Sequence, residues 1–533
     1  MLRRAAFTAV CLAVAGCGLV GPPSTGPHGL SSYDGDLRRL SASGHFDQAL
    51  AVAEEEAGDA GDELLAELNR AVVEHYAGRY EESNARLQAA DQAIEERYTK
   101  SVSRAAFSLV TSDRALAWLP SSSERLMIHV YGALNYLALD EPDEAAVEAR
   151  RLALLLDRLV EEDGVEESGA DTRRLYRSLR YFTAAVFEQA GERNDADVAY
   201  RLAGLDARGD VSGGPPGGEA GDLEAGSAPA GGLGSVVVLV ESGFVAHRIE
   251  QSAHFILGVG ELDDLRYGSD ARRRRYARCF SHRRLGGTVG SWDVAHDDWC
   301  SGLDRRKRRD DDDHDDDDVS YLMRLAWPTM RQAPTARPVG PVRAFSDAAA
   351  PPPVLTAARD AAGLATSHGT TPDPARGAPS DDTAETDRLS RPLESGRPLM
   401  SADLSGAVVH DFNRKAPGIL VKSIARAAVK YTVVQELEEG ARKEDETLGD
   451  VAAVVGNVVA ALTERADTRS WTLLPAQLQL VRLDLPPGEH PIRVAIDGEG
   501  SVSDDSAAER VLELGTVEVR PGRTTVLSTR VWP

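Results

Sequence analysis

Apolar residues between positions 31 and 203 recur every three to four residues, and Gly or short polar breaks separate the periodic segments. This is the spacing of one face of an α-helix, so the pattern predicts a series of amphipathic helices. Helices are expected again between 403 and 465. There, GILVKSIARAAVKYTVVQELEEGA (418–441) has Pro417 as its expected first-turn residue, and TLGDVAAVVGNVVAALTER (447–465) is apolar nearly all round. We expect these two segments to form a buried helical pair.

The helical region contains a repeat. SGHFDQALAVAEEE (43–56) aligns with AGRYEESNARLQAA (77–90), and Gly44 falls on Gly78, 34 residues later. This offset is the tetratricopeptide period, in which pairs of helices stack and leave a concave surface that generally binds another polypeptide. An irregular helical bundle is the alternative. Two further segments share the pattern, YGALNYLALDEPDEAAVEARR (131–151) and YFTAAVFEQAGERNDADVAYR (181–201).

Strand patterns follow the helical region. VVVLVESG (236–243), YLMRLAWP (321–328) and PVRAF (341–345) are apolar and rich in β-branched or aromatic residues. Residues 478–498 and 512–532 each contain two alternating runs joined by a Pro-Gly turn, which predicts two hairpins. The predicted fold class is therefore a multidomain α+β protein. Its N-terminal tetratricopeptide-like helical repeats precede an α+β domain with antiparallel strands and the buried helical pair.

Composition shifts along the chain predict the domain organisation, because Gly/Pro-rich and strongly polar stretches do not pack into a core. We expect a signal peptide at 1–16, a flexible tether at 17–30, a helical domain at 31–203, a Gly/Pro-rich linker at 204–234, and an α+β domain at 235–533 with low-complexity inserts at 301–319 and 346–400.

The first residues predict an exported lipoprotein. Two arginines precede a short apolar stretch at 5–15, which is shorter than the ~20 residues of a membrane-spanning helix. The stretch ends in Val-Ala-Gly-Cys, a pattern at which lipoprotein precursors are cut, so Cys17 is expected to carry the lipid, including palmitate. An ordinary secretory signal is the alternative. Gly18 in place of Asp favours the outer membrane, so we expect an envelope lipoprotein that faces the periplasm.

The net charge of the chain restricts the classes of partner that it is expected to bind. The 533 residues include 85 acidic and 60 basic side chains, for a net charge of −25, which argues against nucleic acid and against charge-driven binding to anionic lipid. The compartment permits disulfides, so Cys279 and Cys300 either pair, closing a loop of about 20 residues, or remain free thiols. We expect no metal site at the nearby His296–Cys300 stretch.

No catalytic constellation is evident. The chain lacks a GxSxG elbow, an HExxH motif, a phosphate-binding Gly loop with Lys, and a paired CxxC motif. His410 and Asp411 are adjacent on a predicted helix, so their side chains point apart, and we expect a surface pair. We therefore predict no enzymatic activity and no cofactor, although a site assembled from distant residues would leave no motif.

Four stretches resemble a family of largely uncharacterised bacterial lipoproteins with tetratricopeptide-type N-termini. They are ADTRSWTLLPAQLQLVRLDLPPGEHPI (466–492), SIARAAVKY (423–431), YTKSVSRAAFSLVTSD (98–113) and ALNYLALDEPDEAAVEARR (133–151). The resemblance implies an envelope protein with a link to the regulation of peptidoglycan synthesis, and it supplies no catalytic residues. Within ADTRSW, Trp471 is expected to anchor the passage into the sheet, and Asp467 either to cap or to pair with Arg469. The alternative is that Arg469 and Trp471 contact a peptide or glycan partner.

The sequence therefore favours a lipid-anchored envelope scaffold that binds a protein partner through its helical repeats. The alternative is a glycan- or peptidoglycan-binding lipoprotein that uses the C-terminal strands. The identity of the partner and the oligomeric state are not specified by any motif in the chain.

Overall fold

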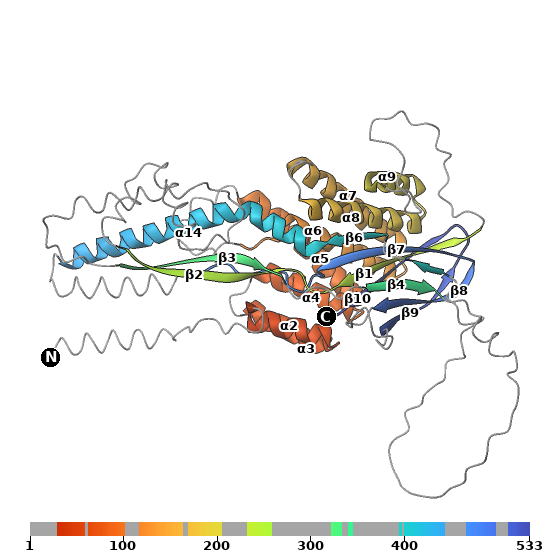
Figure 1. The fold of residues 1–533 in the computed structure, drawn as a ribbon, viewed down its shortest axis with the longest axis horizontal. Helices are drawn as coiled ribbons and strands as arrows, with labels where there is room; N and C mark the ends of the chain where they lie inside the picture. Colours follow the sequence, from red (N-terminus) through yellow and green to blue (C-terminus); the bar gives the residue numbers. More distant parts are fainter. Residues whose placement is uncertain are drawn as a thin grey trace, which may run out of the picture.

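The computed structural model describes residues 29–58, 62–101, 117–163, 169–204, 232–257, 321–332, 339–344, 394–396, 399–442, 465–496 and 510–533. Within these residues the chain has nine helices and three sheets, so the expected α+β class is confirmed (Figure 1). Several predictions fall on other residues. Cys17, Cys279 and Cys300 lie outside the described residues, as do nearly all of the predicted signal peptide, tether, linker, inserts and the 447–465 helix.

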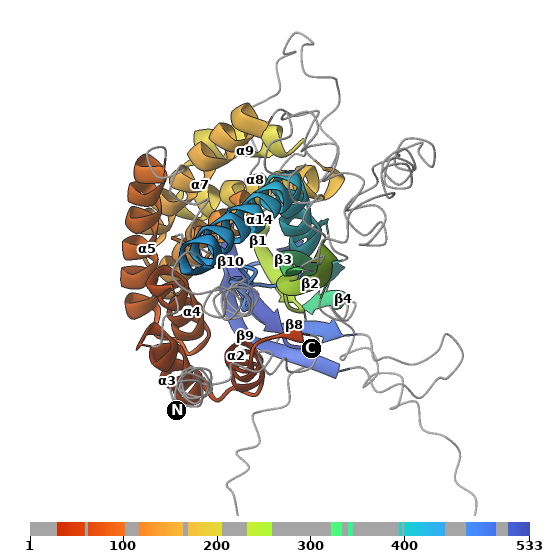
Figure 2. The same cartoon turned by 90° about the vertical axis from the view of Figure 1, so that its left-hand side faces the viewer.

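Within the described part of residues 29–204, eight helices run antiparallel in sequential pairs, each packed on the next (Figures 1 and 2). They are α2 (Ser32–Ala42), α3 (Phe46–Gly58), α4 (Glu63–Tyr76), α5 (Tyr80–Ser101), α6 (Ser122–Ala138), α7 (Pro142–Asp163), α8 (Ala170–Ala190) and α9 (Arg193–Ala203).

The same type of turn connects the two helices in each of the four helix pairs. Residues Gly44, Gly78, Asp140 and Gly191 each have a positive φ. In every case that residue's N–H bonds to the carbonyl three positions earlier, and the next N–H bonds to the carbonyl five positions before itself. A residue in the left-handed conformation lets these N–H groups bond to the last carbonyls of the first helix, and it reverses the chain direction so that the second helix can begin. Glycine adopts this conformation without the steric cost of a Cβ atom.

Two four-stranded sheets pack face to face beside the helices. The first has the order β10-β1-β7-β6 and the second the order β5-β4-β8-β9, while β2 and β3 form a separate two-stranded ribbon. The strands are β1 (Gly234–Ser242), β2 (His247–Leu257), β3 (Tyr321–Arg331), β4 (Val339–Ala344), β5 (Glu394–Gly396), β6 (Met400–Asp403), β7 (Gln477–Leu485), β8 (Gly488–Ile496), β9 (Arg510–Val519) and β10 (Thr524–Val531). The pairing is antiparallel except between β1 and β10, which are parallel.

The first sheet lies between the second sheet and the helices, so both of its faces are covered. On β1, Val236 and Val238 belong to the cluster between the sheets, whereas Val237 and Leu239 belong to the core shared with the helices. This double burial explains the uninterrupted VVVLV run, because a strand covered on both faces has no polar alternation. The helices and the first sheet therefore share one continuous hydrophobic core.

The two predicted C-terminal hairpins are wrong, although their four strands exist. Strand β7 pairs with β1 and β6, whereas β8 pairs with β4 and β9 in the other sheet. The two residues between β7 and β8 are Pro486 and Pro487, and proline cannot adopt the positive φ that a two-residue hairpin turn requires. Between β9 and β10, Arg520 accepts a hydrogen bond from Arg523 N–H across Pro521-Gly522, and the strands diverge to different sheets.

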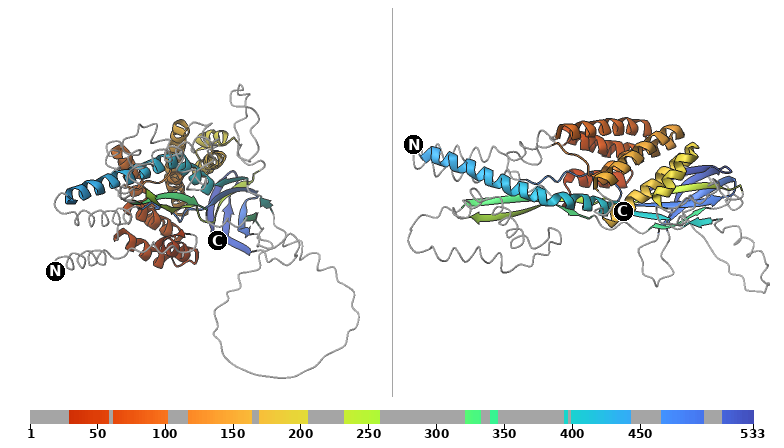
Figure 3. Two further views of the ribbon diagram at one scale, coloured as in Figure 1. Left: turned by 60° about the vertical axis from the view of Figure 1, so that its left-hand side comes forward. Right: turned by 90° about the horizontal axis from the view of Figure 1, so that it is seen from above.

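The predicted start of the long C-terminal helix is also wrong. Helix α14 spans Leu404–Arg442, and Pro417 lies inside it instead of in its first turn. The Asp403 side chain caps the new start by accepting a hydrogen bond from Gly406 N–H. The helix extends away from the body alongside the β2–β3 ribbon (Figure 3). None of the described helices is both long enough and apolar enough to cross a membrane.

Candidate functional site

The inner faces of helices α4 and α6 are covered by the chain's own first sheet. Tyr76 of α4 donates a hydrogen bond to Glu241 of β1 at 2.9 Å, and Tyr131 of α6 lies 3.0 Å from the Tyr76 hydroxyl. The Arg530 guanidinium of β10 lies 4.8 Å from the ring centre of Trp532 and 5.6 Å from that of Tyr76. Burial raises the pKa of both tyrosines, so they stay neutral hydrogen-bond donors. A partner therefore has no access to this face in the folded chain.

His75 in the same interface makes the stability of the fold depend on pH. Its Nδ1 lies 2.6 Å from the Asn135 side-chain oxygen, and burial lowers its pKa from the ordinary 6.5. The unfolded chain therefore takes up a proton at His75 below about pH 6.5, whereas the folded chain resists it until its lower pKa is reached. The stability that neutral His75 provides is fully present above about pH 6.5. It is lost as the pH falls from there toward the lower pKa that His75 has in the folded chain.

We predict that His75→Asn removes this dependence, because the Asn amide can replace the Nδ1–H donor and does not titrate. The slope attributable to His75 is at most about 1.4 kcal/mol per pH unit. Guanidinium unfolding at about pH 7 and about pH 5 measures it. The wild type should lose more stability than the variant on acidification, and equal losses would contradict the assignment.

The two residues expected to anchor the sheet or contact a partner lie inside the protein. Trp471 has 0% exposure. Arg469 pairs with Asp467 at 2.8 Å and with Asp62, the N-cap residue of α4, at 3.3 Å. These contacts are those of an anchor between helix and sheet, and they include the predicted Asp467–Arg469 pair. Contact with a peptide or glycan stays a prediction.

The expected surface pair at the start of α14 is wrong, because His410 is half-buried with a buried Nδ1 and Asp411 is not exposed either. Asp411 is buried and accepts a hydrogen bond from the backbone N–H of Ser123 at 2.8 Å, in the first turn of α6. A carboxylate at a helix N-terminus is stabilised by the exposed N–H groups and by the helix dipole. Asp411 thus fixes α14 on α6.

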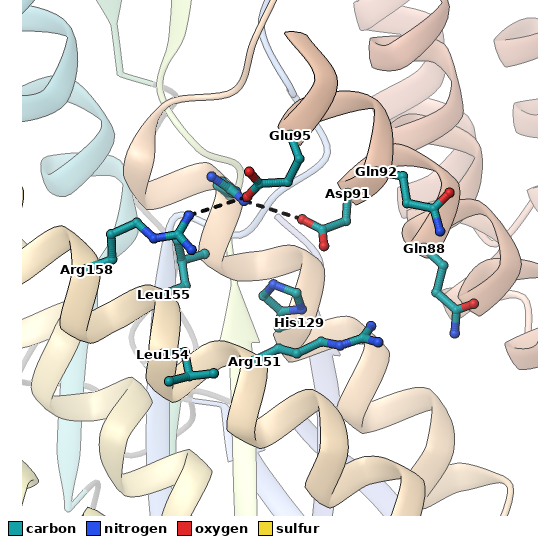
Figure 4. Close-up of a pocket in the computed structure, with 10 residues that line it drawn as sticks. Gln88, Asp91, Gln92, Glu95, His129, Arg151, Leu154, Leu155 and Arg158 are labelled. Carbon is teal, nitrogen blue, oxygen red and sulfur yellow. Dashed lines mark hydrogen bonds and ion pairs between the residues drawn. The ribbon is translucent and has the colours of Figure 1, made fainter. Parts of the chain in front are cut away.

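An open pocket of about 390 Å³ lies on the opposite side of α6, between α5 and α7 (Figure 4). We call this pocket and its two walls the α5–α7 groove. Its residues come from three helices: Gln88, Asp91, Gln92 and Glu95 from α5, Arg125 and His129 from α6, and Arg151, Leu154, Leu155 and Arg158 from α7. None of these positions was singled out from the sequence.

The floor of the groove is a buried histidine held by a carboxylate. His129 Nδ1 lies 2.8 Å from Glu148 Oε2, and Arg151 donates to Glu148 Oε1 at 2.8 Å. This arrangement fixes the imidazole ring and leaves Nε2 without a hydrogen-bond partner among the described residues. The ring faces the space between the two walls (Figure 4).

Ion pairs span one end of the groove. Glu95 of α5 accepts hydrogen bonds from Arg125 of α6 and, at 3.4 Å, from Arg158 of α7. The hydrogen bond from Arg125 and the two positive charges lower the pKa of Glu95, so it is ionised. Asp91 lies 3.6 Å from Arg125, and its buried Oδ1 makes no hydrogen bond within the described part of the chain.

An exposed leucine on α7 supplies apolar surface to the groove. Leu154 is 67% exposed, whereas its neighbours Leu155 and Leu156 are buried in the core. An exposed leucine beside charged side chains favours a polypeptide ligand, because a protein interface has an apolar centre and a polar rim. No group of three or more metal-ligating side chains occurs among the described residues.

Comparison with known proteins found no matching family model, no matching curated protein and no matching solved structure.

Proposed function

We propose that this chain is a lipid-anchored scaffold of the bacterial cell envelope, attached through Cys17, and that it binds a protein partner in the α5–α7 groove. The observation that carries the proposal is the 67% exposure of Leu154 in the wall of a charged, open groove. Apolar patches rimmed by polar residues mark protein interaction sites. In this proposal the protein faces the periplasm from the outer membrane, and its partner is linked to peptidoglycan synthesis.

We infer further that the four helix pairs are tetratricopeptide-like repeats. The identical turn at the end of each first helix supports this, as does the spacing of 34 residues between Gly44 and Gly78. The inner face of the repeats, through which such proteins generally bind a polypeptide, is occupied here by the first sheet. The proposal therefore assigns the partner to the outer face.

Site-specific crosslinking in cells tests this assignment. A photo-crosslinking amino acid replaces Leu154 in one strain and, as a matched control, Leu202 of α9 in another, since Leu202 is 53% exposed on a neighbouring helix pair. We expect one dominant envelope protein crosslinked at position 154 and not at position 202. The absence of an adduct at 154, or the same adduct at both positions, would contradict the proposal.

A further inference from the structure

The two walls of the α5–α7 groove have the same helical spacing. Gln88, Asp91, Gln92 and Glu95 are at positions i, i+3, i+4 and i+7 of α5, and Arg151, Leu154, Leu155 and Arg158 are at the same positions of α7. Each set therefore lies along one face of its helix for two turns. The groove thus presents two parallel rows of side chains.

The two rows differ in charge. The α7 wall carries Arg151 and Arg158, whose side chains are 49% and 52% exposed, and the α5 wall carries Asp91 and Glu95. Arg151 pairs with Glu148 of its own helix, so its remaining N–H groups can donate to a ligand in the groove. The Asp91 side chain is 24% exposed; its Oδ1 is buried and lies 3.6 Å from Arg125, so its other carboxylate oxygen is the acceptor that a cationic group of a ligand can reach.

Apolar contact is available on the α7 wall. Leu154 and Val147, which is 37% exposed, lie seven residues apart on α7 and project from the same face. Exposed apolar side chains that alternate with a row of arginines, opposite a wall that carries carboxylates, are complementary to an amphipathic segment whose apolar stripe separates acidic and basic flanks.

The spacing of the arginines selects the conformation of that segment. Arg151 and Arg158 are seven residues apart, which corresponds to about 10.5 Å along the helix axis. A partner helix repeats the same distance with carboxylates at i and i+7 on one face. A strand rises about 3.3 Å per residue and places residues i and i+3 on opposite faces, so it cannot match both arginines.

We propose that the α5–α7 groove binds an amphipathic helix of the partner. The apolar stripe of this helix covers Leu154 and Val147. Its acidic flank reaches Arg151 and Arg158, and its basic flank reaches Asp91. This inference rests on the proposed function, since it names the chemistry of the partner for the same groove.

Synthetic helical peptides of equal length test the inference by fluorescence anisotropy, with the full chain carrying Cys17→Ser so that no lipid is attached. The first peptide has an apolar stripe, Glu at seven-residue spacing on one flank and Lys on the other. The second has Lys on both flanks. The third has the composition of the first in scrambled order. We expect the first peptide to bind about tenfold more tightly than either of the others.

Charge reversal on the α7 wall should reverse the preference. In the double variant R151E/R158E, we expect the affinity for the mixed-flank peptide to fall about tenfold and the peptide with Lys on both flanks to bind more tightly. R39E is the matched control, because Arg39 is 65% exposed and also pairs with an acid on its own helix. As a second variant, Leu154→Ser changes an exposed side chain without touching the core and should also weaken the mixed-flank peptide.

Three outcomes would overturn the inference: equal affinity for the mixed and scrambled peptides, unchanged affinity in R151E/R158E, or an equal loss in R39E. If one of these outcomes occurs but position 154 still crosslinks to a protein in cells, the proposal of a helical ligand is wrong, whereas the groove remains the proposed partner-binding site. If crosslinking fails as well, the proposed function is also wrong.

Discussion

Replacing Arg482 by Ala should lower the free energy of unfolding by about 3–5 kcal/mol, because it removes one partner of a buried ion pair and leaves the other charge unpaired. The Arg482 side chain in β7 is 4% exposed. It makes two hydrogen bonds to the Glu188 carboxylate of α8, at 3.0 and 3.2 Å, and one to Tyr200 of α9 at 3.1 Å. Without Arg482, the Glu188 carboxylate is left nearly buried, with the Tyr200 hydroxyl as its remaining neutral donor.

Guanidinium unfolding of wild type and variant measures the effect. The double variant Glu188→Gln/Arg482→Met should cost clearly less than the sum of the two single variants, because it removes both charges together. Arg39→Ala, in an exposed pair, should change the stability by less than about 1 kcal/mol. Equal effects of Arg482→Ala and Arg39→Ala would show that α8 and α9 do not dock on β7 as described.

The second large effect is expected at Trp471. Trp471→Ala should cost about 3–5 kcal/mol, because it removes a fully buried indole from the core shared by helices and sheet. Trp471→Phe should cost less, since Phe retains an aromatic ring and the indole N–H makes no hydrogen bond among the described residues. The measurement is again the unfolding free energy, with exposed Leu202→Ala as the reference.

This prediction also separates the two roles expected of Trp471. An anchoring tryptophan lowers stability when it is truncated and leaves the partner's affinity unchanged in the population that remains folded. A partner-contacting tryptophan would do the reverse, so a stable Trp471→Ala variant that loses the partner would contradict the anchoring role.

Local patterns predicted the elements of this fold well. The 3.6-residue period located the helices between 31 and 203, and the β-branched run located β1. Strand partners were not predictable, because pairing is decided by contacts between distant residues. Thus β1 lies between β7 and β10, which are more than 200 residues away in the chain. The wrong hairpins came from assuming that strands joined by a Pro-Gly turn pair with each other, whereas β7 and β8, like β9 and β10, belong to different sheets.

The groove could not be predicted for a similar reason. Its residues come from three helices, and those of α7 lie within the sequence RLALLLDR (151–158). In that run Leu152, Leu155 and Leu156 are buried and Leu154 is exposed. Helical periodicity alone does not show which side of such a helix its neighbours leave open, because that depends on how α5 and α6 pack.

The most direct test of the central claim is the amount of partner that each variant retains in cells. The partner is the protein crosslinked at position 154, and its recovery after affinity purification is compared among wild type, Leu154→Glu and Leu202→Glu, both of which add one charge at an exposed leucine. We expect about a tenfold loss of partner with Leu154→Glu and wild-type recovery with Leu202→Glu. Wild-type recovery with Leu154→Glu would contradict the assignment of the α5–α7 groove as the partner-binding surface.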